Sequence, residues 1–450
     1  MHNRKGTGGD IMNNKVLFIS FDSLRSDYVA GPNKKVNLPN LDSLCKNGVF
    51  FKNTIVQVPL TVPSHTSMFT GMYPFNHGIR DQVVRTNYHT PTIFDILKYK
   101  DFKILGFSDV DLLKDLWFFN WNYSGECNLK EIKSKLKEIK NQNFFIFIHY
   151  WGTHTPYQVK LPPKNIKDII SRFILVFSSL RKWSNLLGKI STLFWLYRVN
   201  RIREMVKNGD NNIVEIIKEG YIKSIKEADK FVGDIREMLS KIGILDDTLI
   251  VITADHGESF NEHEEINSAI GNEYEHGLFL YDNVLKVPLI FYQPSKLAPA
   301  EIATPIREID IVPTILEMLG MGEELITLNF DGCSLIPLLG KNANPKRTEF
   351  IYSEVVRKIQ NKKIEKRSLR SERYKLIIDF IEDKREFYDL KKDPDELNNI
   401  YNRQKTEIAL EMENILEKYR IYDKDKLERE RVKSRIKKLK LIPTSSEKIS

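Results

Sequence analysis

Four short stretches of the chain are apolar at nearly every position and do not alternate between apolar and polar residues. They are rich in Ile, Val and Phe, and comprise Val16–Phe21, Phe144–Ile148, Thr248–Thr253 and Val287–Tyr292. A strand covered by helices on both faces has this pattern, which is typical of a parallel sheet. Between the second and third of these stretches, the segment Val214–Ile242 carries apolar residues at helical spacing and ends before Gly243. This alternation predicts an α/β fold with a doubly wound, mostly parallel central sheet.

Side chains that can bind metals or move protons follow three of these stretches. Asp22 comes directly after the first, His149 and His154 follow the second, and the pair Asp255-His256 follows the third. In open α/β sheets, ligand sites gather beyond the carboxyl ends of the strands. A single aspartate in such a place is more commonly a helix cap, whereas three sets together favour a metal or catalytic site.

The rest of the pattern divides the chain into parts. We expect a catalytic domain over residues 13–345, interrupted by an insertion or lid at about 158–212. A small antiparallel α+β subdomain is expected over 346–420, followed by a charged tail over 421–450. The strands expected in that subdomain are Glu349–Glu354, Ser368–Ile378 and Glu386–Asp389.

The net positive charge of the chain comes from two segments. The chain carries a formal net charge of +9, while residues 160–210 hold +8 (eleven Lys/Arg, three Asp/Glu) and 421–450 hold +5 (ten against five), which leaves about −4 elsewhere. A basic segment with interleaved aromatic residues can meet a membrane surface or a polyanion, and a lid packed on the body is the alternative for 160–210. No nucleic-acid partner is expected.

Compartment is inferred from the N-terminus and the cysteines. The first ten residues are polar and glycine-rich, and no apolar segment is long enough to serve as a signal core or to span a bilayer. Three widely spaced cysteines argue against a disulfide framework or a zinc knuckle. We therefore expect a cytoplasmic protein, with peripheral membrane association as an open alternative.

The segment Thr61-Val-Pro-Ser-His-Thr-Ser-Met-Phe-Thr-Gly71 has the composition of a helix N-terminus, with Pro63 in the first turn. Thr61 would then lie where the helix dipole favours negative charge. A hydroxyl placed there beside a divalent cation can lose its proton and attack sulfur or phosphorus. Taken alone, however, Thr61 is more commonly a simple N-cap.

Five segments in chain order resemble the sulfatase family of the alkaline phosphatase superfamily, over roughly residues 13 to 400. They are Val16–Asp27, Thr61–Gly71, Asp247–Glu258, Tyr274–Pro288, and Arg370–Lys375 together with Phe387–Glu396. The resemblance implies an alkaline phosphatase-like fold and one divalent metal ion (Ca, Mn, Mg or Zn). It implies Asp22, Asp255 and His256 as metal ligands, with Thr61 as nucleophile completing the shell.

The resemblance also implies that His154 and His276 contact the ester oxygens or protonate the leaving group. Two carboxylates and one imidazole independently suit these metals, and a histidine can do either job near neutral pH. His65, His149 and His263 are interpreted as structural histidines.

Four departures from the family pattern bear on the substrate. Thr61 stands where sulfatases carry the Cys or Ser that becomes formylglycine, Ser23 replaces the second aspartate of an Asp-Asp pair, and His65 replaces an arginine. The family's sulfate-contacting lysine is absent around Gly106. We expect a metal-dependent hydrolase or transferase of anionic esters, carried on a glycan or a lipid, with phosphoesters favoured over sulfate esters. The alternatives are a sulfuric ester hydrolase in the strict sense and an inactive binding homologue.

Overall fold

The computed structural model describes most of the chain, with several gaps. The described residues are 14–30, 34, 36–82, 90–109, 121–159, 202, 204–205, 212–263, 276–324, 328–339, 350–359, 361–401 and 406–440, the last range with side chains to 429. The predicted insertion at 158–212 and the end of the predicted tail lie almost wholly outside these residues. No helix in the described part is both long and apolar enough to cross a membrane.

A nine-stranded sheet forms the centre of the molecule, in the order β4-β3-β5-β1-β6-β7-β2-β8, with β9 also paired to β2. Strand β1 lies between β5 and β6 and is parallel to both, whereas β7 runs antiparallel to β6 and to β2. The strands are β1 (Lys15–Phe21), β2 (Val49–Ile55), β3 (Lys103–Ser108), β4 (Tyr123–Gly125), β5 (Phe144–Tyr150), β6 (Thr248–Ala254), β7 (Lys286–Tyr292), β8 (Ala300–Ile302) and β9 (Ile306–Arg307).

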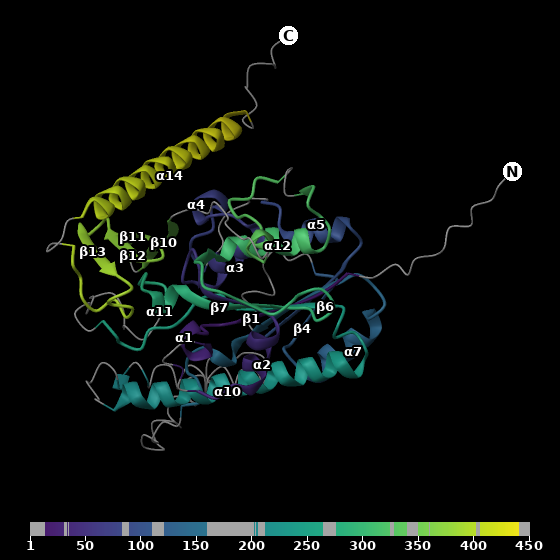
Figure 1. The fold of residues 1–450 in the computed structure, drawn as a ribbon. Coiled ribbons are helices and arrows are strands. Elements are labelled where there is room, and N and C mark those ends of the chain that lie inside the picture. Colours follow the sequence, from purple (N-terminus) through teal and green to yellow (C-terminus); the bar gives the residue numbers. More distant parts are fainter. Residues whose placement is uncertain are drawn as a thin grey trace, which may run out of the picture.

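Helices cover both faces of this sheet (Figure 1). On one face lie α1 (Ser26–Val29), α2 (Pro39–Asn47), α7 (Leu129–Ile139) and α10 (Ile213–Lys241). On the other lie α3 (Thr61–Thr70), α4 (Pro74–His77), α5 (Ile93–Tyr99) and α12 (Ile311–Met318). Successive side chains of a strand point to opposite faces, so Leu17 and Ile19 join the core under α10 while Val16 and Phe18 join the core under α3.

The C-terminal part forms a separate antiparallel sheet, in the order β10-β11-β12-β13, with the long helix α14 lying along it (Figure 1). These elements are β10 (Ile351–Ile359), β11 (Lys362–Arg370), β12 (Tyr374–Asp379), β13 (Lys384–Asp389) and α14 (Glu407–Lys440), and α11 (Asp282–Leu285) precedes β7. Two hydrogen bonds join β10 to the segment that directly follows β2. The Glu354 N–H donates to Gln57 O (2.9 Å), and the Ser353 hydroxyl donates to Val56 O (2.6 Å).

The predicted fold class is confirmed: a mostly parallel, doubly wound sheet with a small antiparallel C-terminal sheet. Two details differ from expectation. The run Ser368–Ile378 is not one strand, because a turn at 371–373 divides it between β11 and β12. The boundary at 421 also does not mark the start of a new element, because it lies inside α14, and Asp423 is buried.

Candidate active site

The ends of β1 and β6 bring two carboxylates together. The two strands pair in parallel with Phe21 opposite Ala254, so Asp22 and Asp255 leave the sheet side by side. The Asp255 N–H donates to Phe21 O (3.2 Å), which ties the two strand ends to each other. Ligand atoms of Asp22, Asp255 and His256 all lie within 4.8 Å of one another, and all three residues are buried.

Thr61 is the first residue of α3, as the sequence predicts, with Leu60 before it in extended conformation. Its hydroxyl Oγ1 lies 3.5 Å from His256 Nε2, and the residue is only 5% exposed. The helix therefore delivers a hydroxyl to the same small volume that the two strands supply with carboxylates.

His256 is oriented with one nitrogen outward and the other toward the carboxylates. Its Nδ1 donates to Gly257 O (2.9 Å), which leaves Nε2 with a lone pair. That Nε2 lies 3.5 Å from Asp255 Oδ2 and 3.9 Å from Asp22 Oδ1. Burial, together with the charge of His276, lowers the pKa of His256 to about 3. The imidazole is therefore neutral at physiological pH, the form in which histidine binds metals.

The two carboxylates have opposite pKa shifts. Burial and the neighbouring Asp22 charge raise the pKa of Asp255 well above its usual value. Burial also acts to raise the pKa of Asp22, but the histidines around it, led by His154, hold it well below. Among the described residues, no Lys or Arg forms an ion pair with either carboxylate.

One oxygen of Asp255 provides the test of whether this pocket fits a metal ion. Its Oδ1 accepts from the backbone N–H of Ser23 (3.1 Å) and of His256 (2.9 Å), whereas its Oδ2 is buried with no hydrogen-bond partner. A buried carboxylate oxygen without a partner is costly. Two carboxylates, a neutral imidazole and a hydroxyl are donors that suit a divalent cation, so the residues fit the ion that the sequence predicts.

His154 and His276 lie together at the side of the cluster. The ring of His276 stacks on that of His256, with centroids 3.9 Å apart, and the ring of His154 lies 5.2 Å from His276. The Nδ1 of His154 donates to Thr155 O (2.8 Å). The structure therefore brings all six predicted site residues into one neighbourhood.

Sequence reasoning assigned no role to Glu258, which lies 3.3 Å from His276 (Oε1 to Nδ1). It is buried and accepts a hydrogen bond from the Tyr157 hydroxyl (2.7 Å), and burial raises its pKa to about 7. A signal was present, because Glu258 follows a buried strand in the same segment as Asp255.

Arg357 was also missed, and nothing local in the sequence marks it. It belongs to β10, yet a Cβ built on Gly277 would lie only 3.2 Å from its Nη1 and 2.6 Å from Leu60 Cδ2. The guanidinium pairs with Asp81 (2.9 Å). It therefore lies against the backbone beside His276, on the side where Leu60 precedes the Thr61 helix.

Comparison with known proteins gives the family. The sequence profile of the sulfatase family matches residues 14–321. This chain belongs to the sulfatase family. A second profile, N-sulphoglucosamine sulphohydrolase, C-terminal, matches residues 274–422. As a member of the alkaline phosphatase superfamily, the protein is a hydrolase acting on sulfuric or phosphoric esters.

Individual relatives are distant but cover nearly the whole chain. The arylsulfatase of Clostridium perfringens is 23% identical over 458 residues, covering 87% of this chain and 91% of that protein. A solved structure of a protein in complex with its substrate D-glucosamine-2-N,6-O-disulfate has 18% identity and a TM-score of 0.70, covering 92% of this chain and 98% of that one. The phosphonate monoester hydrolase of Silicibacter pomeroyi has 18% identity and a TM-score of 0.63, with coverage of 92% and 96%. At these identities the structures establish the fold alone.

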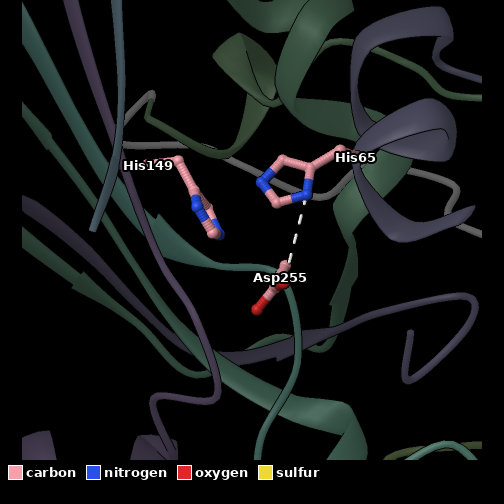
Figure 2. A group of neighbouring side chains, drawn as sticks. All are labelled: His65, His149 and Asp255. Atoms are coloured by element: carbon pink, nitrogen blue, oxygen red, sulfur yellow. Dashed lines mark ion pairs between the residues drawn. The ribbon is translucent and has the colours of Figure 1, made fainter. Parts of the chain in front are cut away.

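Three of the four positions at which this sulfatase-family chain departs from the pattern lie at the cluster, namely Thr61, Ser23 and His65. The Ser23 hydroxyl donates to Asp22 Oδ1 (2.9 Å) and lies 3.5 Å from His256 Nδ1. His65 points from α3 toward Asp255 (Nδ1 to Oδ2, 4.0 Å) and His149 reaches the same place from β5 (Figure 2). The substitutions therefore change the composition of the site itself.

Proposed function

We propose that this protein is a metal-dependent ester hydrolase with Thr61 as its nucleophile, and that phosphate esters are favoured over sulfate esters. The observation that carries the proposal is the position of the Thr61 hydroxyl, 3.5 Å from His256 Nε2 at the N-terminus of α3. Backbone N–H groups at a helix start and the helix dipole both stabilise negative charge there.

The neighbouring hydroxyl of Ser64 is a poor alternative nucleophile. Its Oγ lies 2.6 Å from Asp255 O and 2.7 Å from Glu308 Oε1, and the residue is fully buried. A fully buried hydroxyl between these two oxygens is not placed to reach an ester. The hydroxyls of Thr66, Ser67 and Thr70 contact Val62 O, His77 and Thr66 O instead, so Thr61 is the candidate of this segment.

Asp22, Asp255 and His256 are proposed to hold one divalent cation, with Thr61 completing its surroundings. When bound, such an ion supplies Lewis-acid stabilisation of charge on the ester oxygens and lowers the pKa of a neighbouring hydroxyl. The protein itself contributes orientation: Ser23 and the His256 backbone hold Asp255 through Oδ1, so that Oδ2 faces the cluster.

Protonation of the leaving oxygen is assigned to His276 or His154. His276 lies against Glu258, which can hold the imidazole as a proton donor. His154 donates through Nδ1 to Thr155 O, so any proton it delivers leaves from Nε2. In this sequence of events Thr61 attacks sulfur or phosphorus, one histidine protonates the departing oxygen, and water then releases the group from Thr61.

The preference for phosphoesters follows from the chemistry of threonine. Formylglycine forms from Cys or Ser, and the three cysteines at 45, 127 and 333 all lie outside α3. A threonine ester of phosphate is opened by a second nucleophile, whereas a sulfated aldehyde hydrate can eliminate sulfate, an exit that threonine lacks. The fold is compatible with both substrate classes, since one similar structure is a phosphonate monoester hydrolase.

For the remainder of the substrate we propose an anionic ester on a glycan. Relatives named for such substrates include an N-acetylglucosamine-6-O-sulfatase of Bacteroides thetaiotaomicron, and the substrate in the glucosamine complex is a sulfated sugar. Arg357 is a cation beside His276 that can receive the charge of such a substrate.

The decisive experiment is turnover of an aryl phosphate monoester, a phosphodiester and an aryl sulfate by metal-reconstituted protein. Wild type is compared with Thr61→Ala, and with Thr66→Ala as the matched control. The Thr66 hydroxyl lies on the same helix and donates to Val62 O (2.7 Å). We expect phosphoester turnover that Thr61→Ala abolishes and Thr66→Ala retains.

Other outcomes decide between the alternatives. Sulfate turnover that survives Thr61→Ala would make Thr61 a ligand only and restore a strict sulfuric ester hydrolase. Phosphoester turnover that survives the same change would identify water as the nucleophile. Metal binding without turnover of any of the three esters would favour an inactive binding homologue.

A further inference from the structure

His149 is a buried histidine that the proposed chemistry leaves unused. It lies near the end of β5, opposite Ser20 of β1, and its side chain is 0% exposed. Its Nε2 is 3.5 Å from Asp22 Oδ2, yet it makes no hydrogen bond. A buried imidazole nitrogen that makes no hydrogen bond and faces a carboxylate of the proposed metal-binding cluster requires an explanation.

The surroundings of His149 repeat those of His256. In both rings Nδ1 is held from outside the cluster, by Ser108 Oγ for His149 (3.3 Å) and by Gly257 O for His256 (2.9 Å). In both rings Nε2 faces a carboxylate oxygen at 3.5 Å. Metal-binding histidines are ordinarily oriented in this way, through a hydrogen bond on the nitrogen that does not bind the ion.

His65 lies near His149, but both of its ring nitrogens have hydrogen-bond partners. Its Nδ1 donates to Thr61 O (2.8 Å), and its Nε2 lies 3.0 Å from Ser20 Oγ. Both nitrogens are therefore engaged, although the ring points toward Asp255 (Figure 2). His65, His149 and Asp255 form a second group of possible ligand atoms that lie within 4.8 Å of one another. Of its two histidines, only His149 has a nitrogen without a hydrogen bond.

We propose that His149 is a further ligand of the metal ion, beside Asp22, Asp255 and His256; this rests on the metal centre of the proposed function. Two ligand atoms on one Zn²⁺, each at about 2.1 Å and at a tetrahedral angle, are about 3.4 Å apart. The 3.5 Å separations of His149 from Asp22 and of His256 from Asp255 are close to that value.

The consequence concerns which ion the site selects. Ser23 stands where the family pattern has a second aspartate, so an anionic oxygen is lost, and in this proposal His149 adds an imidazole nitrogen to the ligands. Imidazole suits Zn²⁺ and similar transition-metal ions, while Ca²⁺ and Mg²⁺ prefer oxygen ligands. A shell with two carboxylates and two imidazoles is expected to bind Zn²⁺ in preference to Ca²⁺ or Mg²⁺.

The test counts imidazole ligands by X-ray absorption on the full chain loaded with Zn²⁺, together with metal content per chain. We compare wild type with His149→Asn, whose amide can keep the contact with Ser108 but removes Nε2. His65→Asn is the matched control, because it removes a buried histidine of the same group. His149→Gln returns an oxygen or nitrogen to the position of Nε2 and guards against a folding defect in the asparagine variant.

We expect one Zn²⁺ per chain with two imidazole ligands in wild type and in His65→Asn, and one imidazole in His149→Asn. Zn²⁺ affinity, measured against a competing chelator, should fall at least about 10–100-fold in His149→Asn, with partial recovery in His149→Gln. One imidazole in wild type overturns the assignment of His149 while leaving the metal centre intact. Two zinc ions per chain overturn the single shell, and no bound metal overturns this inference and the proposed metal centre together.

Discussion

Two groups of buried charges in this molecule are built on opposite principles. At the strand ends, Asp22 and Asp255 lie together, no described Lys or Arg pairs with either of them, and Asp255 Oδ2 has no hydrogen-bond partner. Beneath the C-terminal helix, Arg80 pairs with Glu354 and Asp423 (2.9 Å each), and Arg367 pairs with Asp423 (2.6 Å). One group lacks positive charge, whereas the other contains as many cations as anions.

We interpret the first group as the proposed metal site and the second as a structural group that supports the fold. Buried charges are tolerated when they are paired, so the balanced group needs nothing further and holds α14 to the rest of the protein. For the unbalanced group, the described residues supply no Lys or Arg, and we propose that a metal ion provides the positive charge. Four predictions test this contrast, from the largest expected effect to the smallest.

Asp255→Asn should abolish function without weakening the fold. Its Oδ1 can still accept from Ser23 and His256, but the charge that faces Asp22 is gone. We expect metal affinity to collapse and activity to fall by about 10³-fold or more. The melting temperature of the metal-free variant should equal or exceed that of metal-free wild type, because repulsion between the carboxylates is removed. A clearly less stable metal-free variant would contradict the view that this charge is uncompensated.

Asp423→Asn should weaken the fold without affecting metal binding or catalysis. It leaves Arg80 and Arg367 buried without their shared anion, which costs about 3–5 kcal/mol of unfolding free energy. Zinc affinity and kcat of the folded fraction should be unchanged. Asp425→Asn on the exposed side of the same helix is the control and should be neutral in denaturant unfolding. Equal stability of the two variants would remove the structural role of the pairing.

Acid should weaken the support through His77, which lies near Arg80. Its Nδ1 accepts from the Ile79 N–H (3.1 Å), its Nε2 lies 2.8 Å from Ser67 Oγ, and burial, with Arg80 and Lys426 near by, lowers its pKa to about 3. Because this pKa is below the unfolded value of about 6.5, the neutral form's contribution is present above about pH 6.5 and is lost as pH falls toward 3.

At about pH 5 the expected loss is about 2 kcal/mol. Denaturant unfolding of wild type and of His77→Gln, each at about pH 7.5 and at about pH 5, gives the free energy of unfolding at both pH values. The loss due to His77 is the difference between the pH dependences of the two proteins. A variant whose stability falls with pH as steeply as that of wild type would show that His77 is not the titrating group.

Arg357→Ala should raise KM for the anionic ester about tenfold and change kcat little, because Arg357 is beside His276 but not in contact with the metal-ligand group. Lys358→Ala, which alters the exposed neighbour on the same strand, is the control. Steady-state kinetics of both variants give the answer. A fall in kcat at constant KM would place Arg357 in the chemical step instead.

The parts predictable from sequence are those in which a short segment determines the outcome. The close approach of Asp22 and the pair Asp255-His256 was predictable because Asp22 and Asp255 each directly follow a buried strand, and the position of Thr61 because a helix starts there. The roles of these residues stay predictions. The four strands predicted in the central sheet (β1, β5, β6 and β7) agree with the structure to within two residues at each end, because each is a continuous apolar run. The turn at 371–373 was missed because it contains no Gly, Pro or Asn, and the Ser371 hydroxyl closes it instead by accepting from the Tyr374 N–H (2.8 Å).

The parts that were not predictable depend on contacts across long sequence separations. Asp423 looks like any residue of a charged tail until Arg80 and Arg367 are placed beside it. Arg357 approaches Gly277 only because two sheets dock. The environment of His149 depends on the neighbouring strands β1 and β3, so its local pattern does not distinguish a buried structural histidine from one that faces a carboxylate.

The hydrogen bonds between β10 and residues 56 and 57 couple the C-terminal sheet to the segment that leads to Thr61. Glu354 and Ser353 bond to the backbone just ahead of Thr61, and Arg357 follows on the same strand. A chimera that exchanges the C-terminal sheet for that of a relative would therefore also exchange Arg357, the cation that we propose receives the charge of the substrate. We expect such a chimera to differ from the parent protein in the ester that it accepts, although Asp22, Asp255 and His256 are unchanged.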